Sequence, residues 1–280
     1  MESKERVITA SKSLSTYISE IWSARELLWI LAKRDIIVKY KQTILGVAWS
    51  AIRPLITTLV MAFAFGKLGK LDIDTPIPFT LIVIPGVIIW LFFSQSLVSL
   101  SQSLVFNANL VTKVYFPRII IPISTIFLGL VDVLVSVAIF FGLCLFYQFV
   151  PDYKIIFAPL ILILAFLAVF GIGLISAVLN VKFRDIGQLV PFVVQFGYFI
   201  SPVGYPTDLV YKKYEGAWQY KLFCLNPVTG LADAMRWCLL GEYGKFNWDS
   251  FIPLCVFISI SSVAAVLFFR KHENSFVDHI

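Results

Sequence analysis

Arg53 and Asp132 are charged residues inside long apolar stretches of the sequence. They lie about 10 and 13 residues into their stretches, which in an α-helix is a depth of about 15 Å or more. Charged side chains at that depth in a membrane face protein or water and are commonly paired. Two interpretations stay open. Arg53 borders a hydrated pathway, or it forms a structural pair with Asp132 or belongs to a helix that begins later than Ile44.

Phe192, Phe196 and Phe199 are spaced four and three residues apart, with Gln195 beside them, and therefore share one face of a helix. Aromatic rings stack on the C–H faces of sugars without holding them tightly, which suits a sliding polymer. The alternative is packing or lipid contact, because the chain contains 26 Phe. The face is a candidate part of a substrate pathway, together with Arg53.

The side chains that enzymes use are scarce. The four cysteines have neither zinc nor CxxC spacing, and the two histidines, His272 and His279, lie near the C-terminus. Gly66-Lys67 and Gly244-Lys245 lack the loop that cradles nucleotide phosphates. We therefore expect no catalytic residue, no metal site and no cofactor on this chain. If ATP drives a transport process here, ATP and Mg bind to another subunit.

The amino-acid composition indicates whether the chain folds in water or in a membrane. The 280 residues are 59% hydrophobic and only 14% charged, whereas soluble domains are about 45–50% apolar and about 25% charged. This excludes a soluble enzyme, a disordered tail and a coiled coil, and predicts an all-α integral membrane protein. The net charge of +6 is read as a topology signal, and no nucleic-acid partner is expected.

Six segments are candidates to cross the membrane. A crossing helix needs about 20 mostly apolar residues. The segments are 44–66, broken by Arg53-Pro54, then 79–104, 119–149, 155–181, the short 189–205, and 251–269. We expect residues 1–43 to form a cytosolic tail and interfacial helix, and residues 44–280 to form one transmembrane domain.

Lys and Arg counts predict the orientation. With the N-terminus inside, the inner segments hold 14 of the 23 Lys and Arg residues and the outer segments hold 8. The start of the chain has no apolar signal-peptide region. By the positive-inside rule both termini are expected in the cytosol. Trp and Lys/Arg over residues 22–43 favour an interfacial helix, with an ordinary solvated helix as the alternative.

The expected outer segment, 206–250, contains two apolar runs, 217–225 and 228–240, too short to cross. Asn226-Pro227 between them predicts a helix start, and Gly241 a helix end. We expect a re-entrant hairpin, with a small external hairpin as the alternative. Cys224 and Cys238 flank its turn, and we expect free, buried thiols.

Residues 107–118, NANLVTKVYFPR, predict a short helix between the second and third crossings, with an Asn cap and a Pro stop. Apolar side chains exposed on so short a helix suit the groove of a partner. The alternative is a loop packed on the bilayer. The candidate docking residues are Asn107, Asn109, Leu110, Val111, Lys113, Val114, Tyr115 and Phe116.

The order of these motifs resembles the permeases of ABC-2 type polysaccharide exporters, which export O-antigen, capsule or teichoic acid, and is most similar to the O-antigen permeases. The matching stretches are KRDIIVKYKQTILGVAW at 33–49 with Arg53-Pro54, FGKLGKL at 65–71, WLFFSQSLVSLSQSL at 90–104, NANLVTKVYFPR at 107–118, SPVGYP at 201–206 and LNPVTGLADAMRWCLLG at 225–241. One departure is the absence of Pro from 207–217, which concerns the shape of the external loop.

The resemblance implies a homodimer in the bacterial inner membrane, with two cytosolic ATP-binding-cassette ATPase subunits and a lipid-linked polysaccharide as cargo. It implies that 107–118 couples to the ATPase, that 22–43 braces the membrane entrance, and that Asn226, Pro227 and Arg236 belong to an external gate. The alternatives are an ATP-independent channel or secondary transporter, and a membrane-embedded transferase. Few midplane charges, no internal repeat and no carboxylate or His cluster argue against these alternatives.

Overall fold

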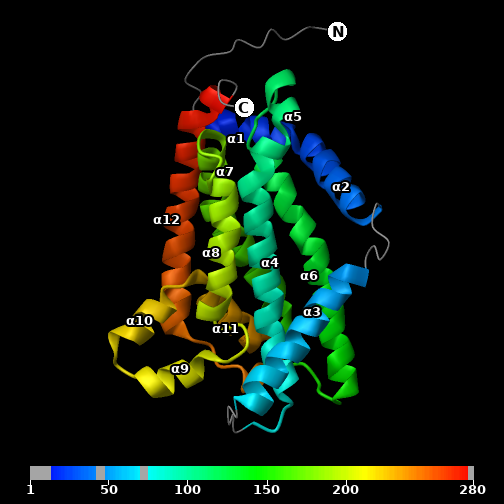
Figure 1. The fold of residues 1–280 in the computed structure, drawn as a ribbon, viewed down its shortest axis with the longest axis vertical. Coiled ribbons are helices and arrows are strands. Elements are labelled where there is room, and N and C mark those ends of the chain that lie inside the picture. Colours follow the sequence, from blue (N-terminus) through cyan, green and yellow to red (C-terminus); the bar gives the residue numbers. More distant parts are fainter. Residues whose placement is uncertain (1–13, 42–47, 70–74, 277–280) are drawn as a thin grey trace.

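The computed structural model of the chain describes residues 14–41, 48–69 and 75–276. Their regular structure is helical, and the long helices run side by side along the longest axis of the molecule (Figure 1). The short helix α5 (Ala108–Lys113) lies at one end, together with α1 (Leu14–Ser23) and η4 (Glu273–Ser275) (Figure 1). We call this the α5 end. The opposite end, which holds α9 (Thr207–Tyr214), α10 (Trp218–Cys224) and α11 (Pro227–Leu240), is the α11 end.

Within the described residues, five helices are long and apolar enough to cross a membrane, so the chain is a multi-pass membrane protein. They are α3 (Ala48–Met61) continued by the π-helix η1 (Ala62–Leu68), α4 (Phe79–Phe106), α6 (Ile120–Phe146), α7 (Ala158–Lys182) preceded by η2 (Tyr153–Phe157), and α12 (Trp248–His272). The predicted crossing at 189–205 corresponds to α8 (Ile186–Ile200). Its 15 residues span about 22 Å, so a sixth crossing stays a prediction.

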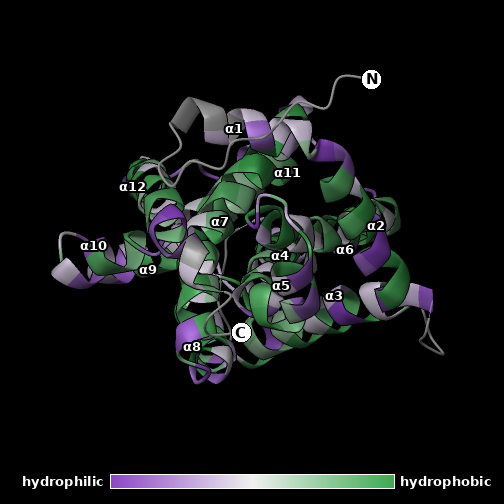
Figure 2. Ribbon diagram, turned by 90° about the horizontal axis from the view of Figure 1, so that it is seen from above, coloured by the Kyte–Doolittle hydropathy of each residue, from purple (hydrophilic) through white to green (hydrophobic). Residues whose placement is uncertain are grey.

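Helix α4 forms the core of the bundle. Figure 2 shows it surrounded by other helices, and it packs against α3, α6, α7, α8 and α11. A Cβ atom on Gly129 of α6 would lie 2.4 Å from Ser96 Oγ of α4, so the two backbones need glycine to come this close. A Cβ atom on Gly173 of α7 would lie 3.0 Å from the Leu100 side chain of α4, which is also a close approach.

The first crossing differs from the prediction in two ways. Helix α3 begins at Ala48, and residues 42–47 lie outside the described part of the chain. The expected break at Arg53-Pro54 is wrong, because α3 continues through Pro54. A proline removes a single backbone donor, and transmembrane helices tolerate that loss when neighbouring groups satisfy the freed carbonyl.

The segment predicted as an interfacial helix forms α2 (Arg25–Lys41). Only Leu31 and Ala32 are buried among its 17 residues, while Trp29 and Ile30 are exposed. Helix α2 packs against α6, and Figure 1 shows it descending obliquely along the side of the bundle. Its apolar packing comes from Leu27, Leu28 and Leu31, and polar contacts described below add to it.

At the α11 end, three helices follow α8: α9 (Thr207–Tyr214), α10 (Trp218–Cys224) and α11 (Pro227–Leu240), with η3 (Gly241–Tyr243) after them. The predicted start is confirmed, because Asn226 Oδ1 accepts from Val228 N at 3.0 Å. The predicted end is confirmed by Gly241, whose φ is +61°. The sequence analysis did not predict α9. Cys224 and Cys238 are buried free thiols, as expected.

Candidate functional site

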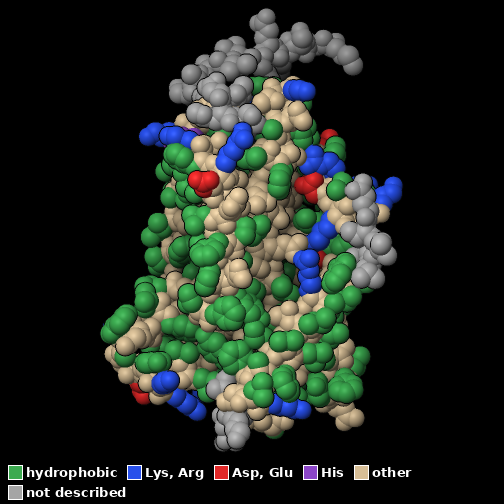
Figure 3. Space-filling model, viewed as in Figure 1, with side chains coloured by type: hydrophobic (Ala, Val, Ile, Leu, Met, Phe, Trp, Pro, Cys, Tyr) green, Lys and Arg blue, Asp and Glu red, His purple; other side chains and the backbone are tan. Residues whose placement is uncertain are grey.

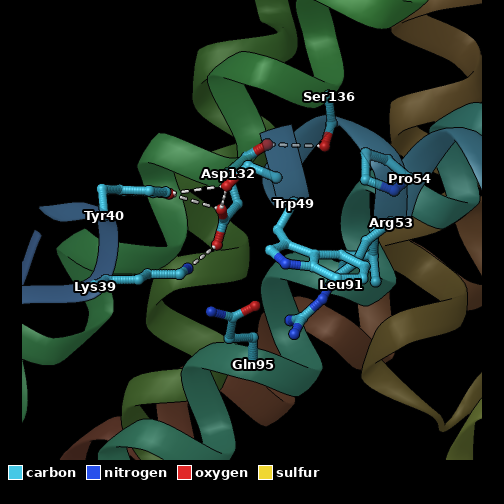
Figure 4. Close-up of a pocket in the computed structure, with 10 residues that line it drawn as sticks. Lys39, Tyr40, Trp49, Arg53, Pro54, Leu91, Gln95, Asp132 and Ser136 are labelled. Atoms are coloured by element: carbon cyan, nitrogen blue, oxygen red, sulfur yellow. Dashed lines mark hydrogen bonds and ion pairs between the residues drawn. The ribbon is translucent and has the colours of Figure 1, made fainter. Parts of the chain in front are cut away.

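A cavity of about 320 Å³ lies between α2, α3, α4 and α6 (Figure 4). We call it the charged pocket, because it holds two cations and a carboxylate between membrane-crossing helices. Its lining residues are Lys39, Tyr40, Trp49, Ser50, Arg53, Pro54, Leu91, Gln95, Asp132 and Ser136. In Figure 3 a group of charged side chains interrupts the largely hydrophobic side of the molecule next to α2.

Asp132 is fully engaged in this pocket. Lys39 Nζ donates to its Oδ2 at 2.5 Å, and Tyr40 Oη and Ser50 Oγ donate to its Oδ1 at 2.8 and 2.6 Å. The predicted Arg53–Asp132 pair is wrong, because α2 supplies the cation instead. The contact is possible because α2 descends beside α6 and brings Lys39 and Tyr40 to the depth of Asp132.

Arg53 is exposed on the pocket wall and forms no ion pair with any residue in 14–41, 48–69 or 75–276. Trp49 lies one helical turn before it and lines the same cavity. Figure 4 shows the Arg53 and Gln95 side chains facing the same space. Two cations and one carboxylate give the pocket an excess positive charge. A surrounding poor in water strengthens that charge's attraction for an anion.

The sequence analysis found Arg53 and Asp132 but missed Lys39, Tyr40, Trp49, Ser50 and Gln95. A membrane-embedded aspartate signals that a cation must be near. The sequence offers several, and local spacing cannot choose among them, because Lys39 and Asp132 are 93 residues apart.

The predicted docking residues lie in α5 and in the residues directly before and after it, and they differ in exposure. Asn109, Lys113, Val114 and Tyr115 are exposed, whereas Leu110 and Phe116 are half-buried. Val111 is 1% exposed and packs into the core, so its predicted exposure is wrong. The reason is that helix geometry turns one side of so short a helix back onto its own bundle. Val114 and Tyr115, which are 50% and 65% exposed, form an exposed patch directly after α5.

Asn107 precedes α5, but its side chain does not cap the helix as predicted. Its Oδ1 accepts from Arg34 Nη2 of α2 at 2.9 Å, and its Nδ2 donates to Ser103 O at 2.9 Å. Asn107 therefore joins α5 to α2.

A second set of contacts holds Arg118, at the C-terminal end of the predicted docking segment 107–118. Arg118 N donates to Glu273 Oε1 at 3.1 Å, and the Tyr17 hydroxyl donates to Glu273 Oε2 at the same distance. Burial, with the Glu273 carboxylate beside it, raises the pKa of Tyr17 above its ordinary value, so the hydroxyl keeps its proton. The predicted docking segment, residues 107–118, is thus held by Tyr17 of α1 and Glu273 of η4 through shared contacts.

Of the predicted gate residues, Arg236 is 3% exposed. It donates to the carbonyl oxygens of Pro202, Val203 and Ile82, and pairs with Asp233 at 3.5 Å. Gly86 permits this, because a Cβ there would lie 2.7 Å from the Arg236 guanidinium. Arg236 therefore fastens α11 to α4 and to the SPVGYP segment.

Asp233, which the sequence analysis missed, also accepts from Thr207 Oγ1 at 2.7 Å. The signal was the i,i+3 spacing of two charges inside an apolar run. Asn226 donates to Ser201 Oγ at 2.9 Å, so it too joins α11 to the SPVGYP segment, and Pro227 is the first residue of α11.

The predicted aromatic face exists. Phe192 and Phe196 of α8 have ring centroids 4.7 Å apart, and both are exposed, as are Gln195 and Phe199. Within the described residues Phe192, Phe196 and Phe199 keep 58%, 53% and 71% of their surface exposed. A polymer, a second copy and lipid are all compatible with it.

The sequence profile of the ABC-2 type transporter family matches residues 26–240. The chain belongs to this family.

Similar proteins of the ABC-2 type family are aligned over nearly their whole lengths. The O-antigen export system permease protein RfbA of Klebsiella pneumoniae is 27% identical over 255 residues, which cover 90% of this chain and 94% of the relative. RfbA of Myxococcus xanthus is 25% identical, with coverages of 94% and 98%. The polysialic acid transport protein KpsM of Escherichia coli is 26% identical, with coverages of 86% and 92%.

The ABC-2 match includes the charged pocket, α5 and α11. These candidate sites therefore lie inside the region that the family profile matches.

Proposed function

We propose that this protein is the transmembrane subunit of an ATP-binding-cassette exporter, and that it moves a lipid-linked polysaccharide, O-antigen in the first instance, across the bacterial inner membrane. The observation that carries the proposal is the near-complete alignment with permeases named for polysaccharide export. The alignments with relatives named for O-antigen export cover 90–94% of this chain, and the alignment with the relative named for polysialic acid transport covers 86%. Capsule or teichoic acid export is the alternative; an ATP-independent channel or secondary transporter is less favoured.

In the proposed arrangement both termini and the α5 end are cytosolic, and α8 with the following SPVGYP segment makes the sixth crossing. The region from α9 to η3 forms the external gate region as a re-entrant hairpin, and α2 runs from the inner interface down to the level of Asp132. Two copies form the pore, and two ATPase subunits that bind ATP and Mg dock on the exposed side of α5. This chain itself hydrolyses no ATP. The exposed Val114–Tyr115 patch and the cationic α2 support this arrangement.

The charged pocket offers a site for the anionic headgroup of the cargo. A lipid-linked polysaccharide carries a phosphate or diphosphate between lipid and sugar. Arg53, which has no counter-ion among the described residues, and Gln95 supply donors for it. The exposed face of Phe192, Phe196 and Phe199 offers weak, repeated contacts to the sugars that follow.

The proposal is tested by deleting the gene and following newly made O-antigen. Lipid-linked polymer should accumulate on the cytosolic side and should reach the surface again when this gene and its ATPase partner are restored together. An ATPase partner with its P-loop lysine replaced by alanine is the control and should fail to restore export. Normal surface O-antigen in the deletion strain would exclude this function, and export with the inactive ATPase would favour the channel alternative.

A further inference from the structure

Besides the apolar packing of Leu27, Leu28 and Leu31, helix α2 is held to the bundle by polar contacts at two places. Near its C-terminal end Lys39 and Tyr40 donate to the two oxygens of Asp132. Five residues earlier, Arg34 donates to Asn107 beside α5. Because only Leu31 and Ala32 of α2 are buried, loss of one polar attachment should let the helix shift.

The two attachments belong to one stiff element. Residues 34 and 39 are separated by about 7.5 Å along a continuous α-helix. Backbone hydrogen bonds link every turn, so a displacement at Lys39 also moves Arg34. Arg34 is additionally oriented by Asp35, to which it is paired at 2.7 Å. A movement that starts in the charged pocket therefore reaches the residue before α5.

In the pocket, the Asp132 carboxylate competes with any anionic ligand for the Lys39 ammonium. Lys39 already has a carboxylate partner, whereas Arg53 has none among the described residues. A phosphate that enters beside Arg53 competes with Asp132 for Lys39. A ligand shifts a conformational equilibrium only if it binds the two states differently. The exchange of Lys39 between Asp132 and phosphate supplies that difference.

We propose that Asp132 holds Lys39, and with it α2, until the anionic headgroup of the cargo takes its place, and that the released helix changes the position of α5 through the Arg34–Asn107 contact. Asp132, Arg34 and Asn107 are then positioning residues that report an occupied pocket to the ATPase docking helix. The inference rests on the proposed function, which supplies both the anionic headgroup and the ATPase.

The test uses the full-length chain in complex with its ATPase subunits, in vesicles with or without undecaprenyl diphosphate. The readout is the ratio of ATP hydrolysis rates with and without this lipid. Asp132→Asn removes the competing charge and keeps an oxygen acceptor, so its rate without lipid should match the wild-type rate with lipid. The ratio should fall to about one from a wild-type change of about fivefold or more, the usual range of coupling between two sites.

Two controls test which part of the lipid acts and whether the position of the removed carboxylate matters. Vesicles with phosphatidylglycerol, and added inorganic pyrophosphate, present phosphate without the polyprenyl carrier and should change the wild-type rate much less. An equal effect of either overturns the assignment to the cargo headgroup. Asp185→Asn removes a carboxylate from the exposed start of α8, outside the pocket, and should leave the ratio at its wild-type value.

A double substitution tests the transmission. Asn107→Leu removes the acceptor for Arg34, so adding Asp132→Asn to it should have no further effect. Asn107→Asp keeps an acceptor for Arg34, now as a charged carboxylate, and loses the donor to Ser103, so in this background Asp132→Asn should still act. If Asn107→Leu prevents assembly with the ATPase, Arg34→Ala removes the same contact from the α2 side.

The inference is overturned if Asp132→Asn leaves the ratio unchanged, if its effect persists beside Asn107→Leu or Arg34→Ala, or if wild-type complex ignores undecaprenyl diphosphate while cells still export polymer. Absence of export in wild-type cells would instead contradict the proposed function, so the two failures are distinguishable.

Discussion

At the scale of single residues, the charged side chains between the helices of the bundle differ in whether they have a counter-ion. Asp132 and Lys39 neutralise each other, and Asp233 and Arg236 do the same at the α11 end. Arg53 alone among these charged residues lines a cavity without a counter-ion in the described parts of the chain. Intramembrane charges are costly, about 2.5–3.5 kcal/mol at a helix centre on insertion scales. An unneutralised one therefore points to a ligand.

Arg53→Gln should weaken binding of undecaprenyl diphosphate about 10- to 100-fold. A hydrogen bond to a charged group contributes about 1.5–3 kcal/mol, and 1.4 kcal/mol corresponds to about tenfold in affinity. Arg53→Lys keeps the charge and should retain most of the binding. The measurement is binding of the lipid to purified protein, with the initial rate of export alongside. Wild-type affinity in Arg53→Gln would exclude the pocket as the headgroup site.

Arg236→Leu should destabilise the protein by about 3–5 kcal/mol, because it leaves the Asp233 carboxylate buried without its cation. Asp233→Asn combined with Arg236→Leu removes both charges and should recover part of the loss. Thermal unfolding in detergent, followed through the reactivity of the buried Cys238 thiol, measures the effect. If Arg236→Leu alone leaves the unfolding temperature unchanged, Arg236 is not the fastening that its contacts indicate.

At the scale of elements, local signals predicted most helices, and long-range contacts explain the misses. The predicted segment 79–104 is close to α4, and Asn226-Pro227 fixed the start of α11, because span length and caps are local properties. The division of α5 into a buried and an exposed side depends on the bundle behind it, so sequence could not place Val111 inside. The predicted partner of Asp132 was wrong for the same reason, because Lys39 reaches Asp132 only through the packing of α2 on α6.

Val114→Asp and Val111→Asp form a matched pair on the docking segment. Val114 is 50% exposed and Val111 is 1% exposed. Val114→Asp should leave folding intact and abolish co-purification of the ATPase, because a charge enters an apolar interface. Val111→Asp should instead reduce the amount of folded protein, because the buried carboxylate has no partner. Normal ATPase recovery with Val114→Asp would place the docking surface elsewhere.

Replacing both Phe196 and Phe199 with Leu tests whether the aromatic face of α8 lies in the polymer pathway. The change keeps most of the hydrophobicity and volume and should cost about 1.5 kcal/mol or less in stability. It removes the flat rings, so export of long polymer should slow while the complex retains ATPase activity. Unchanged export, together with an unreactive thiol in Phe196→Cys treated with a water-soluble reagent, would assign the face to lipid or to packing.

At the scale of the whole molecule, the two ends carry different polar machinery. At the α5 end, Glu273 of η4 accepts from Tyr17 of α1 and from Arg118 in the predicted docking segment. At the α11 end, Asp233 pairs with Arg236 and accepts from Thr207. A transporter that uses cytosolic ATP must present its docking segment to the cytosol. The proposed function therefore requires the α5 end to face the cytosol and the α11 end to face the outside.

Lys182 at the end of α7 and Lys213 in α9 provide a matched test of orientation. Both are exposed, and each ammonium lies over the ring of the following residue, at 5.3 Å from Phe183 and 5.5 Å from Tyr214. Because their local surroundings are alike, a difference in labelling reflects the side of the membrane. In a background without other reactive cysteines, a thiol reagent that cannot cross the inner membrane should label Lys213→Cys from outside.

In the same experiment Lys182→Cys should react only after the membrane is opened. The physical reason is that α8 and the SPVGYP segment must carry the chain across between these two positions. Labelling of both residues from outside would mean that α8 turns back without crossing, which leaves five crossings and puts the two termini on opposite sides. Labelling of Lys182→Cys alone would invert the molecule and remove α5 from the reach of a cytosolic ATPase.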